Sequence, residues 1–168
     1  MPPIIIPNWA VITLDILIWF VIHLLIAKIS NMIPIDYFKK ERRIFIIKNP
    51  KRSAWFYEHI IQIKKWKKYL PDGAKIFKDG FEKKSLQDTS EDYLERFILE
   101  SKRAELSHYL QMLPVPIFFL FNLWWVGLIM IAYAMMVNLP CVFAQRYNRP
   151  RFEKVLAVKR KRQLKGLI

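Results

Sequence analysis

Two long stretches without basic residues constrain this chain more than any other feature. Residues 9–27 contain one acid (Asp15), one histidine (His23) and no lysine or arginine, and residues 110–144 contain no charged residue. A membrane-spanning helix needs about 20 predominantly apolar residues. The first stretch therefore predicts one transmembrane helix. The second is too long for one span and predicts two short spans that form a hairpin, with the bend near 122–127.

The positive charge of the chain lies outside these stretches. Of the 28 lysines and arginines, nineteen fall between Lys28 and Arg103 and nine between Arg146 and Lys165, against 14 acids in all. A net charge of +14 would be typical of nucleic-acid binding in a soluble protein. Here the charged residues are segregated from the apolar ones, which indicates an integral membrane protein and no nucleic-acid partner. Because basic residues favour the cytoplasmic side, we expect the N-terminus outside and both basic blocks in the cytoplasm.

The first stretch differs from a cleaved signal peptide. No basic residue precedes it, and residues 27–29 (Ala-Lys-Ile) make a poor cleavage site, so we expect a retained anchor. The chain has one cysteine, Cys141, which excludes an internal disulfide and is most simply a packing residue.

The predicted fold is an all-α integral membrane protein in four segments. These are an N-terminal transmembrane helix (1–29), a basic helical cytoplasmic or interfacial segment (30–109), a transmembrane helical hairpin (110–145) and a basic cytoplasmic tail (146–168).

Within the second segment, two helices and a turn are predicted. Residues 53–70 place Trp55 and Trp66 at helical spacing among lysines, which predicts either an amphipathic helix at the membrane surface or an ordinary core helix. Pro-Asp-Gly at 71–73 predicts a turn. Thr89 or Ser90 can cap a helix over 91–109.

The helix over 91–109 carries a possible general base. Glu100 and His108 share one face, and Glu105 lies three residues before the histidine. A carboxylate beside an imidazole fixes its tautomer and raises its basicity. The alternative is a surface helix in which Glu100 pairs with Arg103 or Arg96. We expect no metal site, because the chain has only three histidines and no cysteine pair.

Two further groups have both a structural and a functional interpretation. Asp15 and His23 share one face of the first span and are either polar contacts to the hairpin or catalytic groups. Arg146, Arg149 and Arg151 follow the hairpin directly. They are either an anchor on the cytoplasmic side or, because guanidinium matches phosphate and carboxylate, an anion site.

Four motifs resemble one known family. They are IPIDYFKKERRIF (33–45), KKWKKYLPDG (64–73), ESKRAELSHY (100–109) and YAMMVNLPCVFAQRYNRPR (133–151). In this order and spacing they resemble the glycosyl-4,4'-diaponeurosporenoate acyltransferases, small bacterial membrane proteins of carotenoid-pigment pathways, over roughly residues 15–155.

The resemblance implies an O-acyltransferase of the bacterial cell membrane. It would move a fatty acyl group from an acyl thioester, either acyl-CoA or an acyl-carrier protein, to a sugar hydroxyl of a glycosylated, carotenoid-like lipid. Its partners would be membrane lipids and these two substrates, with no bound cofactor. The alternatives are another small membrane enzyme of polyprenyl or lipid substrates, such as a methyltransferase, and a non-enzymatic membrane-surface scaffold.

The residues that lie inside these motifs form the predicted site. The catalytic candidates are His108 as general base, oriented by Glu105 or Glu100. Tyr147, Asn148 or Asn138 would donate to the oxyanion, and Arg146, Arg149 and Arg151 would hold the donor phosphates. The whole predicted substrate- and donor-binding set is Arg103, Trp66, Asp72, Asn138, Gln145, Arg146, Tyr147, Asn148, Arg149 and Arg151.

Overall fold

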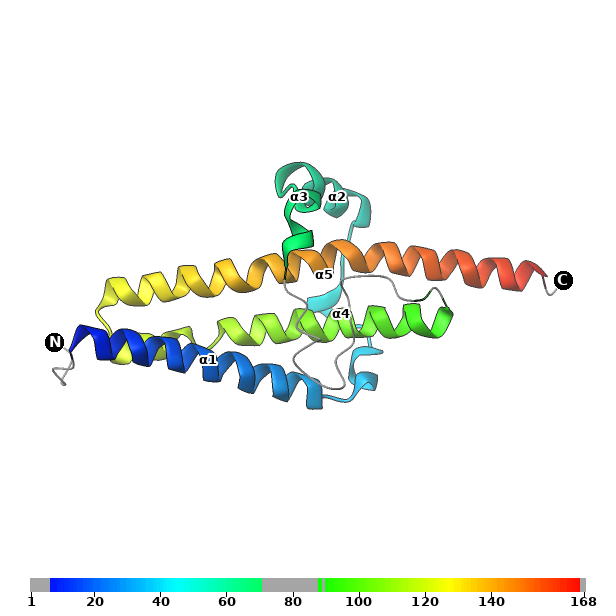
Figure 1. Cartoon of the computed structure of the whole chain (residues 1–168). Coiled ribbons are helices and arrows are strands. Elements are labelled where there is room, and N and C mark those ends of the chain that lie inside the picture. The colour runs from blue at the N-terminus through cyan, green and yellow to red at the C-terminus, as the bar shows by residue number, and fades with distance from the viewer. Residues whose placement is uncertain (1–6, 71–87, 89, 167–168) are drawn as a thin grey trace. The chain divides into compact units, whose positions relative to one another are not determined.

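The computed structural model describes residues 7–70, 88 and 90–166 (Figure 1). In chain order its elements are α1 (Asn8–Met32), the 3-10 helices η1 (Ile35–Phe38) and η2 (Arg43–Phe45), α2 (Pro50–Trp55), the π-helix η3 (Phe56–Ile60), α3 (Ile63–Trp66), the 3-10 helix η4 (Lys67–Tyr69), α4 (Glu91–Met112), the 3-10 helix η6 (Val115–Leu120) and α5 (Trp124–Gly166). The described residues contain no strand, which confirms the predicted all-helical class.

The chain divides into two compact units. Unit 1 comprises Met1–Ile33 and Leu106–Leu139, and unit 2 comprises Pro34–Glu105 and Pro140–Ile168. α4 and α5 each contribute residues to both units.

Unit 1 has an aromatic core. The rings of Trp19 and Phe118 stack with their centroids 4.8 Å apart, and Val115 and Ala134 complete the buried cluster. The Trp19 indole also donates to the sulfur of Met130 at 3.2 Å. The cluster joins α1, η6 and the first part of α5.

Two helices are long and apolar enough to cross a membrane, α1 and α5. Only 11% and 22% of their most apolar 18-residue windows are buried. A helix in the core of a soluble protein buries its apolar surface against other elements, whereas these two leave most of theirs exposed. The apolar part of each helix therefore has a surface suited to a lipid environment.

The chain turns close to the bend predicted at 122–127, but the segment before the turn differs from the predicted helical limb. The chain turns at 121–123, and α5 begins at Trp124. On the way to that turn α4 ends at Met112, and the 3-10 helix η6 replaces a second α-helical span. Pro114 and Pro116 are the physical reason, because proline lacks the N–H that continues an α-helix.

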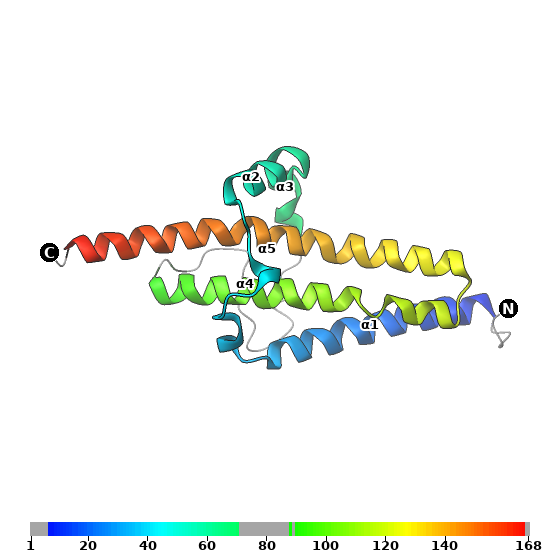
Figure 2. The same cartoon turned by 180° about the vertical axis from the view of Figure 1, so that it is seen from behind.

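The descending limb and the predicted tail form one helix. α5 runs for 43 residues through Pro140 and Pro150, so no helix ends at the predicted 145/146 boundary (Figure 1). The last part of α5 belongs to unit 2, where Phe152 and Leu156 have apolar partners on α4. The ring centroids of Phe97 and Phe152 are 4.1 Å apart, and Leu156 packs in a buried cluster with Leu94 and Ile98. Figure 2 shows the first part of α4 beside this part of α5.

The predicted helix over 53–70 is broken. α2, η3, α3 and η4 occupy this stretch in place of one continuous helix, and the break falls at Gln62, whose φ of 53° lies in the left-handed region. The Trp66 indole donates to the Ile61 carbonyl at 2.9 Å and closes the turn from the other side. The predicted turn at 71–73, including Asp72, lies outside the described residues.

The predicted start of α4 is confirmed. α4 begins at Glu91, and the Ser90 hydroxyl accepts from the Tyr93 N–H at 3.3 Å. This bond satisfies one of the N–H groups that a helix leaves free in its first turn.

Candidate functional site

A fully buried carboxylate organises unit 2. Glu105 of α4 has no exposed surface, and its two oxygens accept from two guanidinium groups of α5: Arg146 Nη1 at 2.6 Å and Arg149 Nη2. Arg146 also donates to the carbonyls of Ile44 and Ile46, at 3.0 and 3.3 Å. The carboxylate of Glu105 thus faces two cations, so these three side chains together carry an excess positive charge.

Arg149 is buried to an unusual degree for an arginine. Its side chain is 1% exposed, and its guanidinium lies 5.9 Å from the centroid of the Phe45 ring. Its second terminal nitrogen, Nη1, is buried without a hydrogen-bond partner among the described residues. An unpaired buried donor is costly, so this N–H is suited to an anionic or carbonyl oxygen of a ligand.

A second carboxylate, Glu58 of η3, also bonds to side chains of α5. It accepts from Lys64 at 2.7 Å, from the Tyr147 hydroxyl at 2.9 Å and from Arg151. These hydrogen bonds, that from Lys64 above all, lower the pKa of Glu58 from 4.5 to about 2. The Arg151 guanidinium also stacks 3.6 Å from the centroid of the Tyr147 ring.

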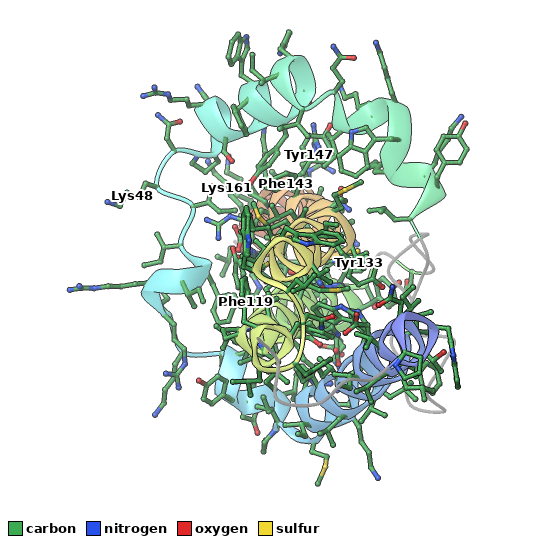
Figure 3. All side chains as sticks on the ribbon, turned by 90° about the vertical axis from the view of Figure 1, so that its left-hand side faces the viewer. Lys48, Phe119, Tyr133, Phe143, Tyr147 and Lys161 are labelled. Carbon is green, nitrogen blue, oxygen red and sulfur yellow. The ribbon has the colours of Figure 1, made fainter. Side chains whose placement is uncertain are left out.

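Lys67 of η4 completes this group. Its ammonium donates to Asn148 Oδ1 at 3.1 Å, and burial together with the charges of Arg151 and Lys64 lowers its pKa. Figure 3 shows Phe143 and Tyr147 on the side of α5 that faces the α2–α3 segment, where Tyr57 packs against both.

Together these side chains form what we call the basic cluster. It has five cations and two carboxylates, and therefore a net charge of about +3. Its charged members are Lys64, Lys67, Arg146, Arg149, Arg151, Glu58 and Glu105. Arg146 and Arg149 are thus paired with the buried carboxylate of Glu105. Arginines that served only as a membrane anchor would not need such a partner.

Unit 1 holds a histidine whose tautomer is set. His108 Nδ1 lies 3.0 Å from Asn138 Oδ1, and Asn138 Nδ2 donates to the Ala134 carbonyl at 2.9 Å. Because the amide nitrogen is committed to a carbonyl, the amide oxygen faces the imidazole and must accept from Nδ1–H. Nε2 is then the nitrogen that carries the lone pair, as a general base requires.

The predicted partners of His108 have other partners in the structure. The two oxygens of Glu105 accept from arginines, as described above. Glu100 accepts from Arg96 and Arg103 at 2.9 and 3.0 Å, which is the alternative that the sequence left open. Asn138 supplies the amide oxygen that bonds to His108 Nδ1.

Asp15 and His23 make polar contacts with residues of the predicted hairpin, which is one of the two alternatives that the sequence left open. Asp15 accepts from Asn122 Nδ2 at 2.8 Å, and His23 Nδ1 lies 2.9 Å from Gln111 Oε1. Asn122 and Gln111 were not predicted as partners, although both are amides inside an apolar run, where polar groups need partners.

The remaining predicted residues have simpler positions. Gln145 is half-buried, and Asn148 accepts from Lys67 through its amide oxygen. Trp66 closes the break at Gln62, a structural role. Glu58 and Lys67 belong to the basic cluster but were not predicted, because their pairing with α5 depends on the break in the preceding helix.

These features define a class: a small helical protein with outward-facing apolar helices, a histidine held in the tautomer of a base, and a cation cluster fixed by a buried carboxylate. Group-transfer enzymes use a general base and a site for an activated donor. The chain belongs to the glycosyl-4,4'-diaponeurosporenoate acyltransferase family, as its motifs predicted, because residues 37–158 match the family of that description.

Relatives of that name in Staphylococcus aureus agree with the family match. The protein of strain MRSA252 is 36% identical over 146 residues, and that of strain bovine RF122 is 35% identical over 146 residues. Each alignment covers 86% of this chain and 87% of the relative. No solved structure matches the chain. The family match selects an acyltransferase over the methyltransferase and scaffold alternatives.

Proposed function

We propose that the protein is a membrane enzyme that moves a fatty acyl group from a thioester donor to a sugar hydroxyl of a glycosylated, carotenoid-like lipid. The names of its relatives supply the reaction class and the acceptor. The exposed apolar surfaces of α1 and α5 support a membrane location, in which the lipid part of the acceptor is soluble. The topology that fits the basic blocks has the N-terminus outside and unit 2 in the cytoplasm.

The observation that carries the catalytic assignment is the bond between His108 Nδ1 and Asn138 Oδ1. In the proposed reaction His108 Nε2 takes the proton of the sugar hydroxyl, and the oxygen attacks the thioester carbonyl. The C–S bond breaks, the ester forms, and the proton passes to the leaving thiolate. Asn138 is a positioning residue that holds the imidazole in the reactive tautomer.

The basic cluster is proposed to hold the anionic part of the donor. Arg146 and Arg151 are partly exposed, with 22% and 43% of their side chains accessible, and can reach a phosphate group. Arg149 is buried beneath them, where Glu105 fixes its direction. The cluster's excess positive charge is what would attract the donor.

The test compares His108→Ala with a matched control, His59→Ala. His59 lies on η3 and is exposed; its Nδ1 lies 3.0 Å from the carbonyl oxygen of Trp55, the last residue of α2, and its ring stacks on that of Trp55. General-base catalysis contributes about 10²–10⁴-fold, so His108→Ala should lose about that factor in ester formation, measured by mass spectrometry with purified protein, donor and acceptor. His59→Ala should stay within about twofold of wild type.

Two substitutions of Asn138 distinguish a role in positioning the imidazole from a purely structural role. Asn138→Asp keeps an acceptor for Nδ1–H and adds a charge that favours the imidazolium, so it should retain activity with its pH–rate profile displaced to higher pH. Asn138→Leu should lose activity at every pH. Wild-type turnover by His108→Ala, or an unchanged pH profile in Asn138→Asp, would contradict the assignment.

A further inference from the structure

The last part of α5 presents a basic face to solvent. Six exposed residues fall within an arc of about 120° on the helix, since successive residues are about 100° apart. We call them the basic stripe: Lys154, Val155, Val158, Lys161, Arg162 and Lys165. The opposite side of the helix carries Phe152 and Leu156, which pack on α4 within unit 2.

The cations of the stripe have no ion pair with another described residue. Arg160, on the packed side, shows the contrast: it pairs with Glu91 and Glu95 of α4. Val155 and Val158 are 45% and 44% exposed between the stripe's cations. Four unpaired cations around exposed valines match a partner surface that is acidic and partly apolar.

A protein partner fits the stripe better than lipid head groups. In the proposed topology the apolar part of α5 ends at Ala144, and at 1.5 Å per residue Lys161 lies about 25 Å further along the axis. The attraction of an anionic bilayer falls off within about 8 Å at physiological salt. The distal cations of the stripe are therefore beyond the reach of the membrane surface, while a soluble acidic protein can approach them.

We propose that the basic stripe is the docking surface of a small acidic acyl carrier protein, which delivers the acyl thioester on its phosphopantetheine arm. This inference rests on the proposed function. It also follows the geometry of α5: Arg151 of the basic cluster precedes Lys154, the first cation of the stripe, by three residues on the same helix. A carrier on the stripe would present the single phosphate of its arm to that end of the helix. The carrier leaves with a free thiol after transfer.

The test reverses the charge of two stripe residues in the full-length protein. The variant Lys161→Glu/Lys165→Glu is compared with the control Lys48→Glu/Lys51→Glu, which makes the same charge change on another exposed part of unit 2. Lys48 and Lys161 are labelled in Figure 3, where the side chain of Lys48 points away from the ribbon. Binding of fluorescently labelled holo-acyl carrier protein is measured by anisotropy in phosphatidylcholine nanodiscs. We expect the stripe variant to raise Kd at least tenfold and the control to leave it within twofold.

Kinetics supply the second readout. The KM for acyl carrier protein should rise by the same factor in the stripe variant, while kcat and the KM for acyl-CoA stay unchanged. Equal carrier binding by wild type and stripe variant would overturn the proposal. So would loss of co-purifying phosphatidylglycerol in the stripe variant with carrier binding intact, which would identify a lipid site. Because the binding readout needs no turnover, failure of acyl transfer from both donors would refute the proposed function separately.

Discussion

The buried pair of Glu105 and Arg149 makes the sharpest prediction about stability. In the variant Glu105→Gln the side chain keeps its shape and loses its charge, so Arg149, 1% exposed, becomes a buried cation without a counter-charge. Removing one partner of a buried ion pair costs about 3–5 kcal/mol. For a chain of this size 1 kcal/mol shifts the thermal midpoint by about 2–4 °C. The midpoint of Glu105→Gln should therefore fall by about 6–20 °C.

The control is a carboxylate in an exposed pair. Asp36 pairs with Lys39 at 2.6 Å, and their side chains are 73% and 66% exposed. Exposed pairs contribute at most about 1 kcal/mol. Asp36→Asn should therefore shift the midpoint by a few degrees at most. The assay is differential scanning fluorimetry of both purified variants in the same detergent.

A double variant isolates the cause of the loss. Glu105→Gln/Arg149→Met removes both buried charges, so no buried cation is left without a counter-charge, and the amide oxygen introduced at position 105 can still accept from Arg146. Arg146 can remain on the carbonyls of Ile44 and Ile46. The double variant should regain most of the midpoint lost in Glu105→Gln. A midpoint for Glu105→Gln within about 2 °C of wild type, or a double variant less stable than the single one, would show that the buried charge of Arg149 does not need Glu105.

Two further predictions concern Glu58 and Gly127. The pKa of Glu58, lowered to about 2, means that its carboxylate stabilises the fold above pH 4.5 and that this contribution is lost as the pH falls towards 2. The difference in thermal midpoint between wild type and Glu58→Gln should therefore be largest above pH 4.5 and vanish near pH 2; a constant difference across this range would contradict it. A Cβ on Gly127 would lie 2.4 Å from the Phe119 ring, so Gly127→Ala should lower the midpoint in the wild-type background. In a Phe119→Ala background the same change should raise stability by about 1 kcal/mol through helix propensity, and a decrease in both backgrounds would show that the ring is not the cause.

Local signals predicted the regular parts of the fold. The apolar run over 9–27 predicted α1, and the cap at Ser90 predicted the start of α4 within a residue. Both depend on short-range chemistry that the sequence displays directly: residue hydrophobicity and a hydroxyl ahead of an acidic first turn.

The features of the fold that were not predicted depend on packing between residues far apart in the sequence. Gln62 adopts a left-handed backbone although it is neither glycine nor asparagine, and the Trp66 bond that closes this break is not encoded by a local pattern. α5 passes Pro140 and Pro150 because its far end is packed on α4. The candidate site shows the same division: His108 and the arginines were singled out from the motifs, whereas their hydrogen-bond partners lie 30 or more positions away in the chain.

The amide partner of His108 has a consequence for the turnover of the enzyme. Asn138 is tied to the Ala134 carbonyl, so its oxygen can accept from Nδ1–H both before and after Nε2 gains a proton. No side chain has to reorient between the two halves of the proposed cycle. A neutral amide also stabilises an imidazolium less than a carboxylate does, so the captured proton is released more readily to the departing sulfur. In the proposed cycle the amide therefore makes His108 a weaker base than a carboxylate partner would, and it favours the return of the proton to the leaving thiolate.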